Sequence, residues 1–347
     1  MLRREFLSTL GWSLAGGWAV SRWGWPAPAQ AATGTLRLVL LADSHLPDGD
    51  DRGPEARALA RAVAEIRRLN PPPDLVLFAG DLAHAGSAEA LALGQEILSD
   101  LPAPLAAVRG EGDGAGSYPT WRSLFGEPRF SLVFSTNPNK PEPSNPREHL
   151  NLNANLLRKT ENGKRKTVIK LLGLDTSLAP SPQGPVFKVG REQRQWLSRE
   201  LARLDPGTPL VILSHAPLKE IFRPWRQWTQ DGPEVMRLLS RFSRVYCFHG
   251  HVHQEAASDQ LSAFSFFPEN EKQKTDNLLP GTHLAFTENP KPRTQNLPLP
   301  ATAWPLPSPL QGTPAAPRPG LGPQGCGWAL ATLGDASLAY QPRVWLA

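Results

Sequence analysis

Five short, mainly apolar runs in this chain are each followed by an acidic residue or a histidine. Each run has the length of a buried strand, and segments with helical spacing, such as residues 54–69, 87–98 and 192–204, lie between several of them. This alternation predicts an α/β fold with layered, buried sheets, which bind ligands at the carboxyl ends of their strands. The runs are residues 36–41, 74–79, 101–108, 209–213 and 242–248.

The residues that follow these runs have side chains that bind metal ions. Side chains at i and i+2 of an extended segment share a face, so Asp43 is expected beside His45, and His251 beside His253. Imidazole and carboxylate together suit ions such as Mn, Fe or Zn, and the chain offers more ligands than one ion needs. We therefore expect a metal site at one edge of the sheet. The other residues at the strand ends are Asp81, Glu111, Asp113 and His215.

The order of these residues resembles the pattern of the calcineurin-like metallophosphoesterase family, which is Asp-x-His, Gly-Asp, Gly-Asn-His-Asp, a single His and Gly-His-x-His. The similarity covers most of the chain after about residue 35, and residues 80–86 resemble the cyclic-nucleotide phosphodiesterase branch. The resemblance implies a layered α-β-β-α sandwich with a metal site at the carboxyl ends of the strands. It also implies two divalent or trivalent ions, of Fe, Mn or Zn, that clamp a phosphate ester and activate water.

The same resemblance assigns a role to each ligand. Asp81 would bridge the two ions, and His249 would bind neither. The ligands of the first ion would be Asp43, His45 and His253, and those of the second would be Glu111, His215 and His251.

The third motif departs from the family pattern. Residues 110–113 read Gly-Glu-Gly-Asp, where the family has Gly-Asn-His-Asp. Glu111 keeps an oxygen ligand and adds a negative charge, so we expect a more tightly bound ion that is a weaker Lewis acid. Gly112 removes the histidine that the resemblance implies as the leaving-group acid. Loss of such an acid typically costs about 10²- to 10⁴-fold in rate, and least for esters with good leaving groups.

Other side chains are candidates to replace that acid or to bind substrate. Asp113, His84 and His249 are candidate acids, and a packed or solvated residue is the alternative for each. Residues 222–228 could form a lid in which Arg223 and Trp225 bind the phosphate ester, with plain packing of the tryptophans as the alternative.

The N-terminus resembles a twin-arginine export signal. Arg3 and Arg4 precede an apolar run at residues 10–20, and small residues predict cleavage after Ala31. The resemblance implies a periplasmic or secreted protein that uses the twin-arginine translocation machinery. The run is short and glycine-rich, so no stable membrane anchor is expected, with an uncleaved anchor as the alternative. Removing the signal lowers the formal net charge from +5 to +3, which does not favour nucleic-acid binding.

The rest of the chain, residues 32–347, is expected to form one metallophosphoesterase domain. The two cysteines, Cys247 and Cys326, could form a disulfide in an oxidising compartment, or Cys247 could pack as a small hydrophobic residue. Three parts of the domain have their own expected structure: an insertion loop and basic hairpin at 137–167, a proline-rich surface segment at 290–325, and a closing hairpin at 326–347.

Two functions follow from these observations. The first is an exported enzyme with a pair of metal ions that hydrolyses phosphodiesters or phosphomonoesters, weakened by the loss of its usual acid. The second is a catalytically silent metal-binding or accessory protein on the same fold. A small phosphate ester is the expected substrate in the first case.

Overall fold

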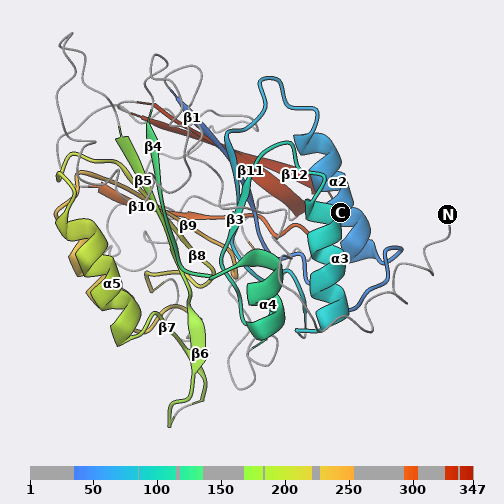
Figure 1. Ribbon diagram of the computed structural model, residues 1–347, viewed down its shortest axis with the longest axis horizontal. Helices are drawn as coiled ribbons and strands as arrows, with labels where there is room; N and C mark the ends of the chain where they lie inside the picture. Colours follow the sequence, from blue (N-terminus) through green and yellow to red (C-terminus); the bar gives the residue numbers. More distant parts are fainter. Residues whose placement is uncertain are drawn as a thin grey trace, which may run out of the picture.

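Two five-stranded sheets pack face to face in the computed structural model of this chain (Figure 1). The strand orders are β12-β11-β1-β2-β3 in the first sheet and β10-β9-β8-β5-β4 in the second. The structure describes residues 35–84, 86–114, 118–135, 168–182, 184–220, 227–253, 293–303, 325–334 and 337–346.

The first sheet combines parallel strands with a C-terminal hairpin. β1 (Leu36–Leu41), β2 (Leu75–Phe78) and β3 (Leu105–Ala107) are parallel neighbours. On the other side, β1 pairs antiparallel with β11 (Gly325–Leu333), which pairs antiparallel with β12 (Leu338–Leu346). The predicted closing hairpin is therefore present, and it extends the sheet beside β1.

The second sheet is parallel except at one edge. β10 (Arg293–Pro298), β9 (Arg244–His249), β8 (Leu210–Ser214) and β5 (Val168–Leu174) are parallel neighbours. β4 (Phe130–Ser135) pairs antiparallel with β5. A separate two-stranded hairpin, β6 (Ser177–Ala179) and β7 (Val186–Lys188), follows β5.

Helices cover the outer face of each sheet and complete the α-β-β-α layers. α2 (Pro54–Ile66), α3 (Ala88–Leu98) and α4 (Tyr118–Phe125) pack on the first sheet, and α5 (Arg191–Ala202) and α6 (Gly232–Leu239) pack on the second. Figure 1 shows α2 and α3 on the right and α5 on the left, with the strands between them. This arrangement is the layered α/β fold that the sequence predicted.

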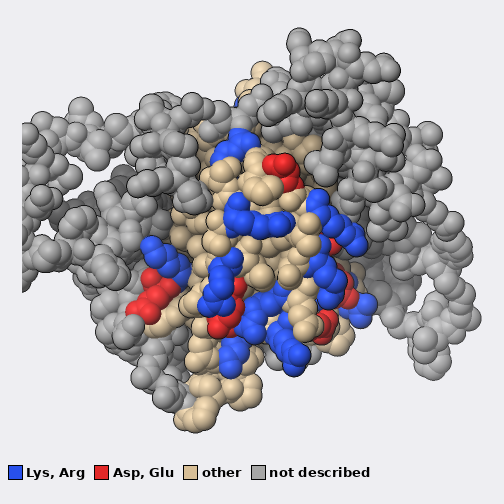
Figure 2. Space-filling model, turned by 90° about the vertical axis from the view of Figure 1, so that its left-hand side faces the viewer, with Lys and Arg blue, Asp and Glu red and all other residues tan. Residues whose placement is uncertain are grey.

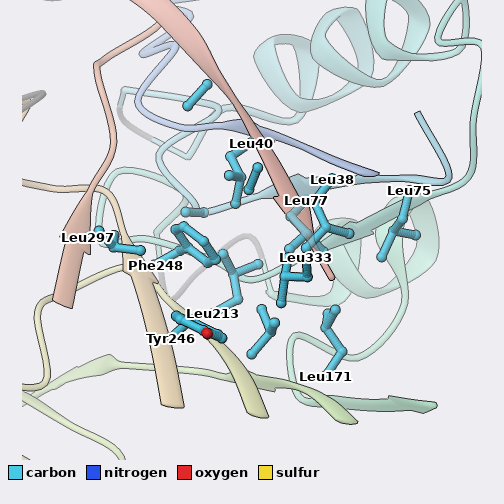
Figure 3. Close-up of a cluster of buried hydrophobic side chains, with 14 of the residues drawn as sticks. Leu38, Leu40, Leu75, Leu77, Leu171, Leu213, Tyr246, Phe248, Leu297 and Leu333 are labelled. Atoms are coloured by element: carbon cyan, nitrogen blue, oxygen red, sulfur yellow. The ribbon is translucent and has the colours of Figure 1, made fainter. Parts of the chain in front are cut away.

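The core between the sheets explains why the strands read as continuous apolar runs. Along β1, Leu38 and Leu40 face the second sheet, while Val39 and Leu41 pack against the helices. Both faces of each sheet are thus buried, so almost every strand position is apolar. Burial of each leucine side chain stabilises the folded state by about 1.5–3 kcal/mol relative to an exposed one. Figure 3 shows the inter-sheet cluster, with side chains from both sheets that include Leu38, Leu40, Leu75, Leu77, Leu171, Leu213, Tyr246, Phe248, Leu297 and Leu333.

The proline-rich segment at 290–325 differs from its predicted position on the surface. Its first part is β10, which pairs with β9 inside the second sheet, and Leu297, Leu299 and Ala301 are almost completely buried. Among the described strands, β10 is the last of its sheet and pairs along one edge, and a proline is tolerated in such a strand. Residues 304–324 and the predicted insertion at 137–167 lie outside the described residues.

The two cysteines are free thiols, and of the two alternatives the structure shows Cys247 packed as a small hydrophobic residue in the core. Cys247 belongs to β9 and Cys326 to β11, which are in different sheets. Burial raises the pKa of Cys247 to about 12 and that of Cys326 to about 11, which keeps both thiols protonated.

Charge on the α5 side of the molecule is mixed in sign. Figure 2 shows this side, where acidic side chains interrupt the lysines and arginines. On α5 itself, exposed Arg191 and Arg199 alternate with exposed Glu192. Among the described helices, none has the length and apolar character needed to cross a membrane.

Candidate metal centre

Left-handed backbone marks the ends of the strands that carry the predicted ligands. Among the described residues, each non-glycine residue with a positive φ angle is one of these ligands. Such backbone is uncommon for residues other than glycine, although Asn, Asp and His adopt it more often than the rest, and it clusters at functional sites. The φ angles are 57° for Asp43, 48° for His45, 56° for Asp81, 67° for His251 and 52° for His253.

Backbone hydrogen bonds hold the turns after β1 and β2 side by side. The Asp43 amide donates to the Gly80 carbonyl at 2.9 Å, and the His45 amide donates to the Asp81 carbonyl at 2.9 Å. A ligand from the second sheet joins them, since the His251 amide donates to both Asp43 carboxylate oxygens at 3.0 and 3.1 Å. The two sheets therefore meet at Asp43.

The first ligand cluster consists of Asp43, His45 and His253. Asp43 Oδ1 lies 3.3 Å from His253 Nε2, and the Nε2 atoms of His45 and His253 lie 3.1 Å apart. All three side chains are buried. These three donor atoms point at one another, as ligands of a common ion do.

The second ligand cluster consists of Glu111, His215 and His251. Glu111 Oε2 lies 2.7 Å from His215 Nε2, and Glu111 Oε1 lies 2.8 Å from His251 Nδ1. The carboxylate comes from the loop after β3 in the first sheet, whereas both histidines follow strands of the second sheet. Glu111 thus spans the two sheets.

Asp81 lies between the two clusters. Its Oδ2 is 3.7 Å from His45 Nε2 and 3.5 Å from His215 Nε2. Its Oδ1 accepts a hydrogen bond from the Gly112 amide at 2.7 Å. Asp81 therefore presents one oxygen to both clusters and is held in place by the other, which is the position predicted for a bridging ligand.

The structure determines the tautomer of His215. Its Nδ1 lies 2.7 Å from the Ala79 carbonyl oxygen, which can only accept, so Nδ1 carries the proton. In the neutral ring this leaves the lone pair of Nε2 facing Glu111 and Asp81. A hydrogen bond of this kind fixes the orientation of a metal-binding histidine.

The buried charges of the clusters act strongly on one another. Burial raises the pKa of Asp81 well above its ordinary value, and the negative charge of Glu111 adds to this effect. Burial also opposes ionisation of Glu111, but His251 and His215 hold the pKa of that carboxyl well below its ordinary value. Burial lowers the pKa of His45 to about 3, so this ring is neutral.

These residues fit metal ions. Imidazole nitrogens and carboxylate oxygens converge in a buried site, and a cation would offset the repulsion among Asp43, Asp81 and Glu111. The combination of nitrogen and oxygen donors suits Mn, Fe and Zn without choosing among them.

The loop that carries Glu111 has no room for a side chain at position 112. A Cβ atom on Gly112 would lie 2.5 Å from the Ala83 carbonyl oxygen and 3.0 Å from Asp81 Oδ1. This loop conformation therefore requires a glycine at position 112. The same glycine leaves the loop without an acidic side chain there. Sequence reasoning identified the missing acid but not the steric reason for it.

Asp113 holds the backbone of this loop. Its Oδ2 accepts from the amides of Asp81 and Gly110 at 3.1 and 2.9 Å, and its Oδ1 accepts from the Ala83 amide at 2.9 Å. The side chain is completely buried, and burial raises its pKa to about 6. These contacts argue against the hypothesis that Asp113 protonates a leaving group.

Two other histidines were predicted as candidate acids. The His84 side chain is exposed, and its ring lies edge-on to His45 with 5.8 Å between ring centroids. His249 is buried, its Nδ1 lies 3.1 Å from the Gly250 carbonyl, and burial lowers its pKa to about 4. An acid role therefore stays a hypothesis for His84 and has no support for His249. Arg223 and Trp225 lie outside the described residues.

Sequence reasoning missed Arg109, which directly precedes the third motif. Its guanidinium binds Asp175, which follows β5, and Ser177, which begins β6. The only local signal is an arginine beside Gly110, because its partners are more than 60 positions away in sequence.

A family model of calcineurin-like phosphoesterases matches residues 36–255, and this range contains all the residues of both clusters. The chain belongs to the calcineurin-like phosphoesterase family. This membership agrees with the order of motifs along the sequence and with the convergence of the ligands at the strand ends.

Individual proteins that resemble this chain share little sequence identity with it. A probable glycerophosphodiester phosphodiesterase, GpdQ, from Arcobacter nitrofigilis is 27% identical over 205 residues, which span 57% of this chain and 63% of that relative. A dimetal phosphatase from Danio rerio is 15% identical with a TM-score of 0.49, and the match covers 92% of this chain and 96% of that one. A purple acid phosphatase from yellow lupin is 14% identical with a TM-score of 0.44, covering 92% and 54%.

Proposed function

We propose that this calcineurin-like phosphoesterase is an exported enzyme with two metal ions that hydrolyses phosphate esters, phosphodiesters in particular. The observation that carries the proposal is the position of Asp81, whose Oδ2 faces a histidine of each ligand cluster at 3.5–3.7 Å. A shared carboxylate oxygen is what a pair of closely spaced ions requires.

The described residues supply separate ligands for the two ions. Asp81 would be shared between them. When bound, the ions would clamp the phosphate oxygens and lower the pKa of a water molecule. The first ion would be held by Asp43, His45 and His253, and the second by Glu111, His215 and His251.

The chain itself orients these ligands before any ion binds. The Gly112 amide fixes Asp81, the Ala79 carbonyl fixes the His215 ring, and the His251 amide fixes Asp43. Because each ligand already has its orientation, little side-chain entropy is lost when an ion binds. Burial of the ligands keeps bulk water away from them, which strengthens their electrostatic interactions.

The loop at 110–113 sets the expected substrate preference. It offers no side chain at Gly112, and its Asp113 is committed to backbone amides. An ester whose leaving group departs without a proton therefore loses little from this arrangement, whereas an alkoxide leaving group loses up to about 10²- to 10⁴-fold. Hydrolysis is thus expected to be weakened for unactivated esters.

The name of the relative from Arcobacter nitrofigilis adds a substrate class to test, the glycerophosphodiesters. Their leaving group is an alkoxide, which needs a proton donor, so this site is expected to hydrolyse them slowly. Export by the twin-arginine route rests on Arg3, Arg4 and the apolar run at 10–20. A reporter fused to residues 1–31 should reach the periplasm only when the translocation machinery is present, and cytoplasmic retention would contradict export.

One observation favours a second candidate function, a metal-binding protein without turnover. The steric exclusion of a side chain at Gly112 means that the loop cannot regain an acid by a single substitution. A protein that had lost selection for catalysis would tolerate such a loop, while its buried ligand clusters would still hold metal.

Hydrolysis of two esters distinguishes these functions. The mature protein, reconstituted with Mn²⁺, Fe²⁺ or Zn²⁺, is assayed with a nitrophenyl phosphodiester and with a glycerophosphodiester, and Asp81→Asn serves as the blank. We expect cleavage of the nitrophenyl ester, slower cleavage of the glycerophosphodiester, and loss of both in the variant. Binding of metal without cleavage of either ester would support the binding protein, and activity that survives in Asp81→Asn would exclude the proposed mechanism.

A further inference from the structure

We propose that Arg109 is a positioning residue for the second ligand cluster, because its guanidinium holds the loop that carries Glu111 against the second sheet. The inference rests on the proposed function, since it concerns the residues that would bind the second ion. It adds a residue that was not among the candidates derived from the sequence.

The loop after β3 has to reach across the space between the sheets. Glu111 comes from the first sheet, yet its partners His215 and His251 follow β8 and β9 of the second. The later part of the loop is bound to the first sheet instead, since the Gly112 amide and the Asp113 carboxylate both bond to the turn after β2. These bonds alone do not hold Glu111 toward its histidines.

Arg109 provides a bond from this loop to the second sheet. Its Nη2 donates to Asp175 Oδ2 at 2.9 Å and to Ser177 Oγ at 3.1 Å. The ion pair is largely shielded from solvent, with side-chain exposures of 13% for Arg109 and 17% for Asp175. The guanidinium also lies over the Tyr118 ring of α4, 4.7 Å from its centroid. A shielded pair of this kind is screened by salt much less than an exposed one.

The acceptor is itself fixed by the second sheet's own helix. Gln193 of α5 is buried, and its side-chain amide bonds to both backbone groups of Asp175, at 2.9 Å to the N–H and 2.8 Å to the carbonyl. A further bond joins Gln193 to the Val189 carbonyl at 3.1 Å. Asp175 therefore offers Arg109 an anchor that has little freedom to move.

The backbone of Arg109 and the His215 ring of the second cluster both lie close to Gly80. A Cβ atom on Gly80 would lie 2.8 Å from the Arg109 carbonyl carbon and 2.8 Å from His215 Nδ1. The Arg109 backbone and the His215 ring thus both pack around Gly80. A shift of Arg109 would change the position of Glu111, two residues further on, relative to this ring.

The hairpin bound by Arg109 also contacts the cluster. Ser177 begins β6, and Phe187 on the paired strand β7 packs edge-on against His251, with 4.7 Å between ring centroids. Arg109 therefore connects the Glu111 loop to the segment that supports a histidine of the same cluster. The contacts of Arg109 with Asp175, Ser177 and Tyr118 do not involve a residue of the first cluster.

The test measures Mn²⁺ binding at each cluster separately in the mature protein. His253→Gly disables the first cluster and leaves the second, and His251→Gly does the reverse. Glycine suits both positions because it has no donor atom and adopts the left-handed backbone found there at no steric cost. In the His253→Gly background, Arg109→Gln should weaken Mn²⁺ binding by about 10- to 100-fold, the usual effect of losing a residue that supports a ligand. In the His251→Gly background, the same change should alter binding by less than about twofold.

Two further variants identify the contact responsible. Asp175→Asn should cause the same selective loss, and the double variant should lose little more than either single one, since both remove one interaction. Arg109→Lys keeps the charge without the planar fork and should recover part of the affinity. This partial rescue is not expected if Arg109 only fills space.

The chain offers a matched control in Arg129. Its guanidinium pairs with Glu192 at 3.4 Å and lies 5.2 Å from the centroid of the Trp196 ring, so Arg129→Gln also removes an arginine from a carboxylate and an aromatic ring. This pair is exposed and joins the residue before β4 to α5. Mn²⁺ binding in both backgrounds should be unchanged, and thermal unfolding of every variant shows whether the fold is retained.

The outcomes separate this inference from the proposed function. Equal weakening at both clusters, or none at the second, would overturn the positioning role of Arg109 while leaving a two-ion enzyme intact. A wild-type protein that binds no metal ion would remove the proposed function and this inference together. Selective weakening at the second cluster, shared by Asp175→Asn, supports both.

Discussion

Individual ligand residues in this protein adopt backbone that most side chains avoid. Asp43, His45, Asp81, His251 and His253 all have positive φ angles, and each such residue costs about 1–2 kcal/mol. These turns direct side chains from the two sheets toward common points, and the interactions formed there offset the strain. Strain of this kind, found at five predicted ligands, is independent support for a functional centre.

At the same scale, the missing acid cannot be restored at position 112. We expect Gly112→His to lower the free energy of unfolding by about 1–3 kcal/mol, the usual effect of overpacking. It should also fail to speed hydrolysis of the glycerophosphodiester, because its Cβ would lie 2.5 Å from the Ala83 carbonyl oxygen and 3.0 Å from Asp81 Oδ1. Urea unfolding and the hydrolysis assay measure the two effects.

Gly53→Ala is the control for this substitution. Its Cβ would make an ordinary contact of 3.4 Å with Glu55, and its φ of −58° suits alanine. Unchanged stability is expected there. A Gly112→His protein as stable as the wild type and faster on the glycerophosphodiester would show that the loop does accept a side chain.

At the scale of elements, a helix that supports the site is held in place by a side chain from another segment. Asp231 directly precedes α6. Its carboxylate accepts hydrogen bonds from the Val189 and Gly190 amides at 2.9 Å each and forms an ion pair with Arg194. These groups form the start of α5, the helix that carries Gln193. The order of α5 therefore depends on a residue outside it.

We expect Asp231→Ala to destabilise the protein by roughly 2 kcal/mol or more, because it leaves amides and an arginine without their acceptor. Urea unfolding measures this change. Asp205→Ala is the control, since its carboxylate accepts from the exposed Gly207 amide at 2.7 Å and its loss should cost much less. Equal losses for the two variants would mean that the Asp231 carboxylate has no special part in α5.

At the scale of the whole molecule, the metal centre lies where the two sheets meet, so metal binding should stabilise the entire fold. Asp43, Asp81 and Glu111 bring three buried or largely buried carboxylates together from the first sheet, and the histidines that face them come mainly from the second. Without a cation, the repulsion among these carboxylates opposes the packing of the sheets.

We expect a chelator to lower the melting temperature of the mature protein and Mn²⁺ to restore it. Each ion present at 100 times its Kd adds about 2.7 kcal/mol to the free energy of unfolding. Differential scanning calorimetry measures the shift, and Asp81→Asn should show a smaller one. Identical melting curves with chelator and with Mn²⁺ would contradict a metal centre between the sheets.

Much of this architecture could be predicted from local sequence. The apolar runs correspond to β1, β2, β3, β8 and β9, and the ligands were predicted from their positions at the strand ends. The burial of β10 could not be predicted, because its composition is that of a surface segment and only its pairing with β9 places it in the sheet. Arg109 was missed for a related reason, since its partner Asp175 lies 66 residues away.

The sequence by itself determined which side chains stand at the strand ends, because strand length, apolar burial and i, i+2 alternation are local properties. Only the tertiary structure decided which of them share a cluster, which oxygen of Asp81 faces both, and why Gly112 has no side chain. Those outcomes depend on distances between residues far apart in sequence, and the packing of two sheets sets these distances. The Ala79 carbonyl that orients His215 shows this directly, as the two residues are separated by 136 positions and follow strands of different sheets.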